Sequence, residues 1–407
     1  MKSLQHLFRF GPGPSSSHTI APFLAAQAFG RLLDGKTKKV SVTFLGSLAF
    51  TGMGHHSMSA VKDGLAGYEV EVVCDKKTKA PHPLTMVFQA DLPEGPLSVT
   101  YLSLGGGELY SEQDPSVIEK DIYPFSSLKE MRAYMDQEGL KTFRDLCLRF
   151  EPPTIDTYME GIVQKMLDSV KQGLQKDGLI PANDNPRLQV LRSAKGIYQK
   201  SRKLLGSARK TLLLSAYAYA VAEGSACGEA VVTAPTCGSS GVLPAVCYYA
   251  HRQRKIPLAR IRDALYAAGM IGNLVKQNAS IAGSIGGCQA EIGTASSMAA
   301  AAICVLEGLD LDAIEYAAEA AMEHFLGLSC DPVDGYVIIP CIERNGIATI
   351  RAVTCFQYAK FISPIRKNKV NFDDVVAAMK MTGDSIAPEY KETGLGGLAY
   401  ILDPRHC

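Results

Sequence analysis

Apolar and polar residues alternate in short stretches in the first third of the chain. The stretches centre on residues 40–44, 84–90 and 97–101, and a period of two residues is typical of strands that bury one face. Before and between them, Ser15–Leu33 and Ser57–Leu65 space their apolar residues as helices do. The pattern predicts a small α/β domain in the first third of the chain, and the proline-containing segment 111–125 is expected to lead out of it.

Beyond residue 125 this alternation becomes rare and helical spacing dominates. Residues 311–325 place apolar side chains on one helical face and glutamates on another, with Asp310 as the expected N-cap. The apolar stretches Thr211–Ala222 and Met298–Leu306 are too short to span a membrane and are expected to be buried core helices. Pro181–Pro186 is expected to be a loop or linker. The whole pattern predicts an α+β protein, with a larger, mainly α-helical second domain.

Composition adds constraints on partners and compartment. The length of 407 residues favours two domains, and 42 basic residues against 41 acidic ones give no reason to expect a nucleic acid or membrane partner. The first residues lack the apolar run of a signal peptide, which indicates the cytoplasm. In that compartment the 11 cysteines are expected to be core residues or metal ligands, not disulfides.

Two segments of the predicted small domain carry candidate chemistry. In Gly11–Thr19 the hydroxyls of Ser15, Ser16, Ser17 and Thr19 surround His18 just before a helical run, an arrangement that suits a carboxylate or phosphate. An ordinary helix cap is the alternative interpretation. His55 lies on a glycine-rich loop, where a histidine can face a site and titrate near neutrality, although many loop histidines are simply solvated.

Further candidates lie in the predicted helical domain. Thr233–Gly241 offers the hydroxyls of Thr233 and Thr236 with glycines that allow close backbone approach, although it could be a plain helix-joining turn. Cys288, Cys330 and Cys341 have polar or glycine-rich neighbours, unlike the core-like Cys247 and Cys304. The sequence contains no Cys-x-x-Cys pair, so a metal cluster would need ligands from distant segments. Three thiolates could hold three corners of a cubane and leave one iron open as a Lewis acid that assists loss of hydroxide.

Several of these segments together resemble the iron–sulfur L-serine dehydratases. The matching motifs occur in order along nearly the whole chain and are Gly13–Thr19, Thr233–Thr236, Gln277–Ile281, Gly287–Gln289, Leu328–Val333 and Pro340–Asn345. The resemblance implies a β domain over about residues 1–124, fused to a helical catalytic α domain over about residues 125–407. It further implies that Cys288, Cys330 and Cys341 hold a [4Fe–4S] cluster. The terminal Cys407 would occupy the fourth iron until substrate displaces it.

The resemblance also implies roles for the other candidates. His18 and His55 would reach the cleft between the domains as acid–base or carboxylate-binding groups, with either one as the base. The carboxylate of L-serine would lie near Ser15–Thr19. Thr233, Thr236, Asn278 and Ser280 would also contact the amino-acid substrate, and a homodimer is expected.

Other functions remain compatible with the sequence alone. The same chemistry could act on another β-substituted amino acid, such as L-threonine or L-cysteine. A pyridoxal-phosphate enzyme could run a similar reaction, but the sequence offers no convincing lysine motif for the Schiff base. A non-catalytic amino-acid sensor could keep the fold, although a sensor has no need of three cluster-binding cysteines.

Overall fold

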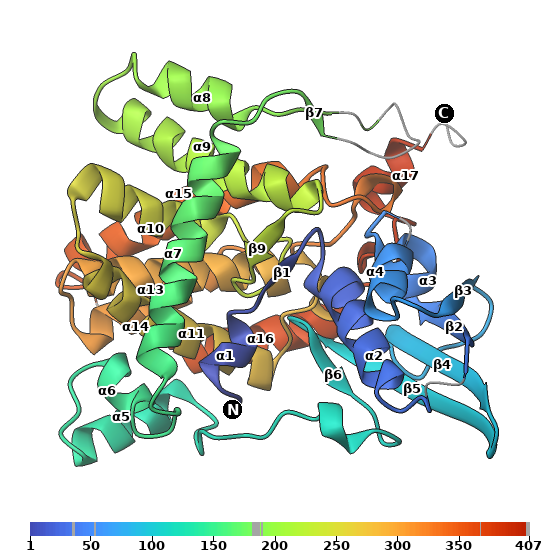
Figure 1. Ribbon diagram of the computed structural model, residues 1–407. Coiled ribbons are helices and arrows are strands. Elements are labelled where there is room, and N and C mark those ends of the chain that lie inside the picture. Colours follow the sequence, from blue (N-terminus) through green and yellow to red (C-terminus); the bar gives the residue numbers. More distant parts are fainter. Residues whose placement is uncertain (35–36, 53, 181–187, 189, 367, 404–407) are drawn as a thin grey trace.

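A computed structural model of the chain describes residues 1–34, 37–52, 54–180, 188, 190–366 and 368–403 (Figure 1). After the N-terminal segment 1–12, the blue and cyan part of the chain forms a sheet with helices packed on it, and the remainder forms a larger helical body beside it. The α+β architecture expected from the sequence is therefore confirmed, with a small sheet domain followed by a mainly helical one.

The sheet of the small domain has the strand order β3-β2-β4-β5-β6. Its strands are β2 (Lys39–Gly46), β3 (Glu69–Asp75), β4 (Leu84–Leu92), β5 (Gly95–Gly105) and β6 (Glu108–Tyr110). β2 and β3 run parallel, and the other neighbouring pairs are antiparallel. Alternate residues of the central strands are buried, and helices α2 (Ala21–Gly30) and α4 (Ser57–Gly64) pack against this core.

The predicted strands and helices of this domain are present with somewhat different ends. The expected helix over residues 15–33 begins with a π-helical turn, η1 (Ser16–Ile20), before α2. Strand β3 was not predicted. Its charged residues alternate with Val70 and Val72, which pack against the core but stay only partly buried because β3 lies at the sheet edge.

The first twelve residues pack against the helical body and not against the sheet. Leu4 and Leu7 of helix α1 (Leu4–Leu7) and the following Phe8 are buried in the helical core. Strand β1 (Phe10–Pro12) then pairs antiparallel with β9 (Ala230–Val232). The chain therefore crosses from the helical body into the small domain just before the serine-rich turn at Ser15.

The helical body is arranged around helix α13, which packs against α10, α11, α14 and α15. Many of its residues are small, so neighbouring helices approach closely. The helices are α5 (Leu128–Gln137), α6 (Phe143–Cys147), α7 (Ile155–Gly173), α8 (Ala194–Ser201), α9 (Gly206–Ala226), α10 (Val242–Arg254), α11 (Leu258–Asn278), α12 (Gly283–Gly286), α13 (Thr294–Leu306), α14 (Leu311–Glu323), α15 (Cys341–Phe361), α16 (Phe372–Ser385) and α17 (Gly397–Ile401).

Several sequence predictions for this body are confirmed. Asp310 caps α14 by accepting a hydrogen bond of 2.9 Å from the backbone N–H of Ala313. The apolar stretch at 211–222 lies in α9 and the one at 298–306 lies in α13. The expected loop at 181–186 lies outside the described residues.

One described helix is longer than the sequence pattern suggested. The π-helical turn η4 (Gln289–Gly293) continues directly into α13, and the resulting stretch Gln289–Leu306 is long and apolar enough to cross a membrane by length and composition. It is 89% buried inside the protein, so its apolar side chains are already covered by neighbouring helices.

Candidate active site

Thiols from distant segments meet at one end of α13. Cys288 lies just before η4, Cys330 lies in the loop that follows α14, and Cys341 is the first residue of α15. The sulfur atoms of Cys288 and Cys330 and a carboxylate oxygen of Glu291 all lie within 4.8 Å of one another. Burial, together with the negative charge of nearby Cys288, raises the pKa of the Cys341 thiol well above its ordinary value. Cys341 therefore belongs to the same group. Cys407 lies outside the described residues.

Arg344 supplies the positive charge of this group. It lies one helical turn after Cys341, donates to the carbonyl oxygen of Ser329 at 2.9 Å, and lies 3.3 Å from a carboxylate oxygen of Asp331. A hydrogen bond with Cys330 lowers the pKa of the Cys288 thiol, and the Arg344 charge lowers it further, although burial opposes both effects. The arrangement therefore favours a thiolate at Cys288.

Gly283 leaves space among these donors. A Cβ atom on this residue would lie 3.0 Å from the Cys330 sulfur and 3.0 Å from a carboxylate oxygen of Glu291. Any side chain here would fill the region on which the thiol and the carboxylate converge. Clustered thiols, a nearby guanidinium and a side-chain-free cradle together fit an iron–sulfur cluster held by thiolates.

Two buried histidines lie next to the thiols. The rings of His18 in η1 and His55, which follows α3 (Ser47–Thr51), are 0% exposed and stack with their centroids 4.5 Å apart. Burial lowers the pKa of His55 to about 4 and that of His18 well below its ordinary value. Both imidazoles are therefore neutral at physiological pH.

Hydrogen bonds fix the tautomer of each ring. The Ser47 hydroxyl donates to the carbonyl oxygen of Glu392 at 2.8 Å, so it accepts at 3.2 Å from Nε2 of His18, which must carry the proton. Nδ1 of His18 then accepts at 3.0 Å from the hydroxyl of Ser17. Nδ1 of His55 donates at 2.9 Å to the carbonyl oxygen of Thr51. Nε2 of His55 therefore carries a lone pair, and this atom has no hydrogen-bond partner among the described residues.

Glu392 connects the histidines with the thiols. Its carboxylate Oε1 lies 3.6 Å from Nδ1 of His18 and 3.6 Å from Nε2 of His55. Its backbone N–H donates at 2.7 Å to the carbonyl oxygen of Cys330, in a left-handed conformation with φ of 58°. Burial, with the charges of Glu291 and Cys288, raises the pKa of this carboxyl well above its usual range. A basic nitrogen, a carboxylate and potential metal ligands thus share one buried site.

Comparison with known proteins identifies the family. Residues 3–79 match the family model of the serine dehydratase beta chain, and residues 84–399 match that of the serine dehydratase alpha chain. The chain belongs to the serine dehydratase family. The two models meet between residues 79 and 84, whereas the resemblance of the motifs implies a domain boundary at about residue 124, which stays a prediction.

The serine dehydratase relatives span the full chain. An L-serine dehydratase from Helicobacter pylori strain J99 is 35% identical, with 98% of this chain and 99% of the relative covered. One from Streptomyces coelicolor is 36% identical, covering 98% of each chain. L-serine dehydratase 1 of Escherichia coli K12 is 35% identical, covering 98% of this chain and 99% of the relative.

Some predicted substrate-binding hydroxyls of this serine dehydratase lie at the site. Ser15, Ser16, Ser17 and Thr19 are all buried beside His18, and the Thr19 hydroxyl donates at 2.7 Å to the carbonyl oxygen of His55. In the helical body, the Thr236 hydroxyl donates at 2.7 Å to Glu291. These hydroxyls therefore orient the histidines and one carboxylate.

The structure places the other predicted substrate-binding residues in backbone contacts. The Thr233 hydroxyl donates at 2.6 Å to the carbonyl oxygen of Leu7, next to the β1–β9 pair. Asn278 donates at 2.8 Å to the carbonyl oxygen of Ser126 at the start of the helical body. The Ser280 hydroxyl accepts at 3.0 Å from the N–H of Ala282.

Sequence reasoning did not single out Glu291, Arg344 or Glu392. Glu291 follows Cys288 by three positions and Arg344 follows Cys341 by three, a spacing that brings side chains to one helical face and could have identified both residues. No such spacing points to Glu392, because its histidine partners, His18 and His55, lie hundreds of residues earlier in the chain.

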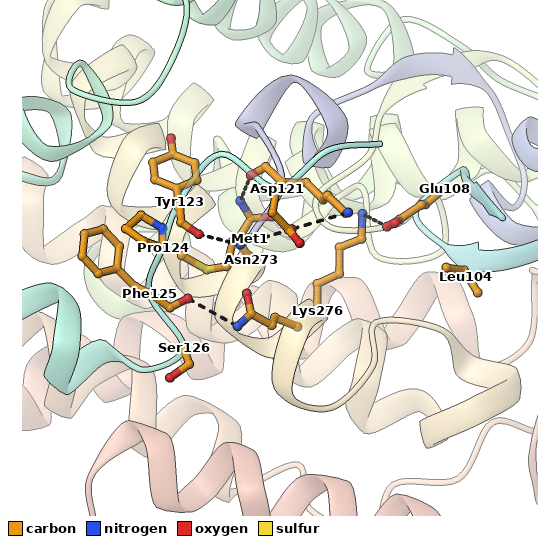
Figure 2. A pocket seen from close by; sticks show the side chains of 12 residues that line it. Met1, Leu104, Glu108, Asp121, Tyr123, Pro124, Phe125, Ser126, Asn273 and Lys276 are labelled. Carbon is orange, nitrogen blue, oxygen red and sulfur yellow. Dashed lines mark hydrogen bonds and ion pairs between the residues drawn. The ribbon is translucent and has the colours of Figure 1, made fainter. Parts of the chain in front are cut away.

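A separate cavity of about 470 Å³ lies at the seam between the small domain and the helical body. Figure 2 shows charged groups around it, and these are paired with one another: the Met1 ammonium with Asp121, and Lys276 with Glu108. Among the described residues that line this cavity there is no cysteine or histidine, so they offer none of the chemistry of the thiol and imidazole site.

Proposed function

We propose that the protein is an L-serine ammonia-lyase, which converts L-serine to pyruvate and ammonia. One observation carries the proposal: the unpartnered Nε2 of the neutral His55 lies in the same buried site as the thiols of Cys288, Cys330 and Cys341. Loss of water from serine needs both a base for the Cα proton and help for the departing hydroxyl. Relatives named L-serine dehydratase support this substrate.

Cys288, Cys330 and Cys341 are the residues that would hold a [4Fe–4S] cluster, with Arg344 as their counter-charge. A bound cluster with an open iron would supply a Lewis acid, which would assist departure of the serine hydroxyl. The terminal Cys407 is our candidate for a ligand that substrate displaces.

The chain's own groups perform the proton chemistry. His55 is the better candidate for the base, because its Nε2 lone pair is free, whereas Nδ1 of His18 accepts from Ser17. The substrate carboxylate lies near the hydroxyls of Ser15–Thr19. Removal of the Cα proton and departure of hydroxide as water give aminoacrylate, which tautomerises to an imine. Hydrolysis of the imine gives pyruvate and ammonia.

We also infer that the enzyme acts in the cytoplasm as a homodimer. All ten cysteines among the described residues are free thiols, which suits a reducing compartment. Light scattering of the purified protein tests the dimer, which requires twice the chain mass of 43.7 kDa.

The decisive experiment is anaerobic purification with iron and sulfide analysis, followed by a pyruvate assay on L-serine. We expect Cys330→Ser to lose both the broad iron–sulfur absorbance and turnover. Cys74→Ser, which changes a thiol on edge strand β3, is the matched control and should retain both. Retained activity in Cys330→Ser would refute the proposal. Parallel assays of 2-oxobutyrate from L-threonine and sulfide from L-cysteine test the alternative substrates.

A further inference from the structure

Glu392 is a buried carboxyl group without a lysine or arginine partner in the part of the chain that the structure describes. It is 4% exposed, and among the described residues it forms no ion pair with a lysine or arginine. Its neighbours at 3.6 Å are Nδ1 of His18 and Nε2 of His55, the two ring nitrogens that carry no proton in the tautomers fixed above. Neither contact is therefore a hydrogen bond. Burial and the nearby negative charges of Glu291 and Cys288 raise the pKa of this carboxyl, and they outweigh Ser284, which lowers it through its backbone N–H and its hydroxyl.

The neighbouring carboxylate, Glu291, is in a different situation. It accepts a hydrogen bond of 2.7 Å from the Thr236 hydroxyl, and Arg344 is near enough to lower its pKa. Oε2 of Glu392 has no hydrogen-bond partner among the described residues. Glu392 therefore has an oxygen whose lone pairs are open to a ligand, whereas Glu291 is already held by Thr236.

The free oxygen of Glu392 faces the same space as the cysteine sulfur. A Cβ atom on Gly283 would lie 3.4 Å from Oε2 of Glu392 and 3.0 Å from the sulfur of Cys330. A molecule held by this carboxylate therefore extends toward the thiols. An ammonium group is a cation with N–H donors and no acceptor. At this carboxyl it would supply the positive charge that the described neighbours lack, and it would favour the ionised form over the protonated form that burial favours.

We propose that Glu392 binds the α-ammonium group of the amino-acid substrate. This inference rests on the proposed function and assigns the group that recognises an α-amino acid. Because Oε1 of Glu392 is 3.6 Å from Nε2 of His55, an ammonium at the carboxylate places the adjoining Cα–H next to that base. Glu392 thus selects ligands that carry an α-amino group and aligns the bond to be broken.

The test compares two unreactive ligands that differ only in the ammonium, L-alanine and propanoate. Equilibrium dialysis with radiolabelled ligand measures both dissociation constants on the cluster-loaded protein, independently of turnover. We expect the wild type to prefer L-alanine, and Glu392→Gln to weaken L-alanine by about 10- to 100-fold while changing propanoate by less than about 3-fold. Glu389→Gln, an exposed carboxylate on the same segment, is the matched control and should change neither constant.

Three results would overturn the inference. If Glu392→Gln weakens both ligands equally, the residue is structural. If the protein holds a stoichiometric divalent metal ion that Glu392→Gln loses, the site is a metal centre. Should the variant not fold, the wild type still decides, because equal affinity for propanoate and L-alanine excludes an ammonium site. A wild type that selects L-alanine but makes no pyruvate refutes the proposed function and leaves this inference standing.

Discussion

At the scale of single residues, the tautomer of His55 decides which atom of the site is basic. The carbonyl oxygen of Thr51 takes the Nδ1 proton, so the lone pair lies on Nε2. Asparagine reproduces the Nδ1–H donor but has no counterpart of Nε2. We therefore expect His55→Asn to keep the hydrogen bond to Thr51 and to lower kcat on L-serine by about 10²- to 10⁴-fold. Near-normal kcat in this folded variant would mean that another group is the base.

The same histidine makes stability depend on pH. Its pKa is about 4 in the folded protein, against an ordinary value of 6.5 in the unfolded chain. Between these values the unfolded chain binds a proton that the folded protein does not, so acid favours unfolding. The contribution of His55 is fully present above pH 6.5, and about 3 kcal/mol is lost as the pH falls to 4.

Urea unfolding at pH 7 and at pH 4.5 measures this effect. The stability difference between the two pH values should be smaller in His55→Asn than in the wild type, because the variant has no imidazole to protonate. An equal difference in both proteins would contradict the burial effect assigned to this ring.

At the scale of elements, the short helix α12 positions a glycine against the thiols. Gly283→Ala would place a Cβ 3.0 Å from the Cys330 sulfur. We expect this variant to fold but to lose bound iron and to lower turnover on the order of 10²-fold, since small displacements at a reacting centre are costly. Iron analysis and the pyruvate assay check both effects.

Gly161→Ala is the matched control. This glycine is exposed within α7, where a Cβ would meet nothing within 4 Å. Alanine should leave iron content unchanged and raise stability by up to about 1 kcal/mol, because glycine is a poor helix residue. Equal iron loss in both variants would indicate that the effect at Gly283 is not local.

Sequence periodicity predicts the elements of this fold better than it predicts the site. Strands β2, β4 and β5 bury alternate residues in the core of the small domain, whereas Val70 and Val72 of the edge strand β3 pack against the same core but stay only partly buried. The sequence motifs identified the cysteines and histidines that lie together in the structure. Glu392 could not be found in this way, since its role depends on contacts with η1 and the His55 loop that only tertiary structure creates.

At the scale of the whole molecule, a buried ion pair joins the small domain to the helical body. Lys276 of α11 lies 2.5 Å from Glu108 of β6, and their side chains are 9% and 10% exposed. Removal of one partner leaves the other charge buried without compensation. We expect Lys276→Met to lower the free energy of unfolding by about 3–5 kcal/mol. Urea unfolding of this variant and of the double variant Lys276→Met with Glu108→Gln tests the pairing, because the double variant should lose less than the sum of the two single changes.

The hydrogen-bond chain from His18 through Ser47 to the carbonyl oxygen of Glu392 crosses between the two parts of the molecule. In the small domain alone, Ser47 would lose that acceptor and its hydroxyl could turn to donate to the ring, so His18 would exchange between its two neutral forms. Nitrogen NMR of the isolated residues 1–124 should detect this averaging, whereas the intact enzyme should give one form. Docking of the two domains therefore sets the protonation pattern of the site as well as its shape. If the two parts of the chain were produced separately, activity would return only when they bind to each other.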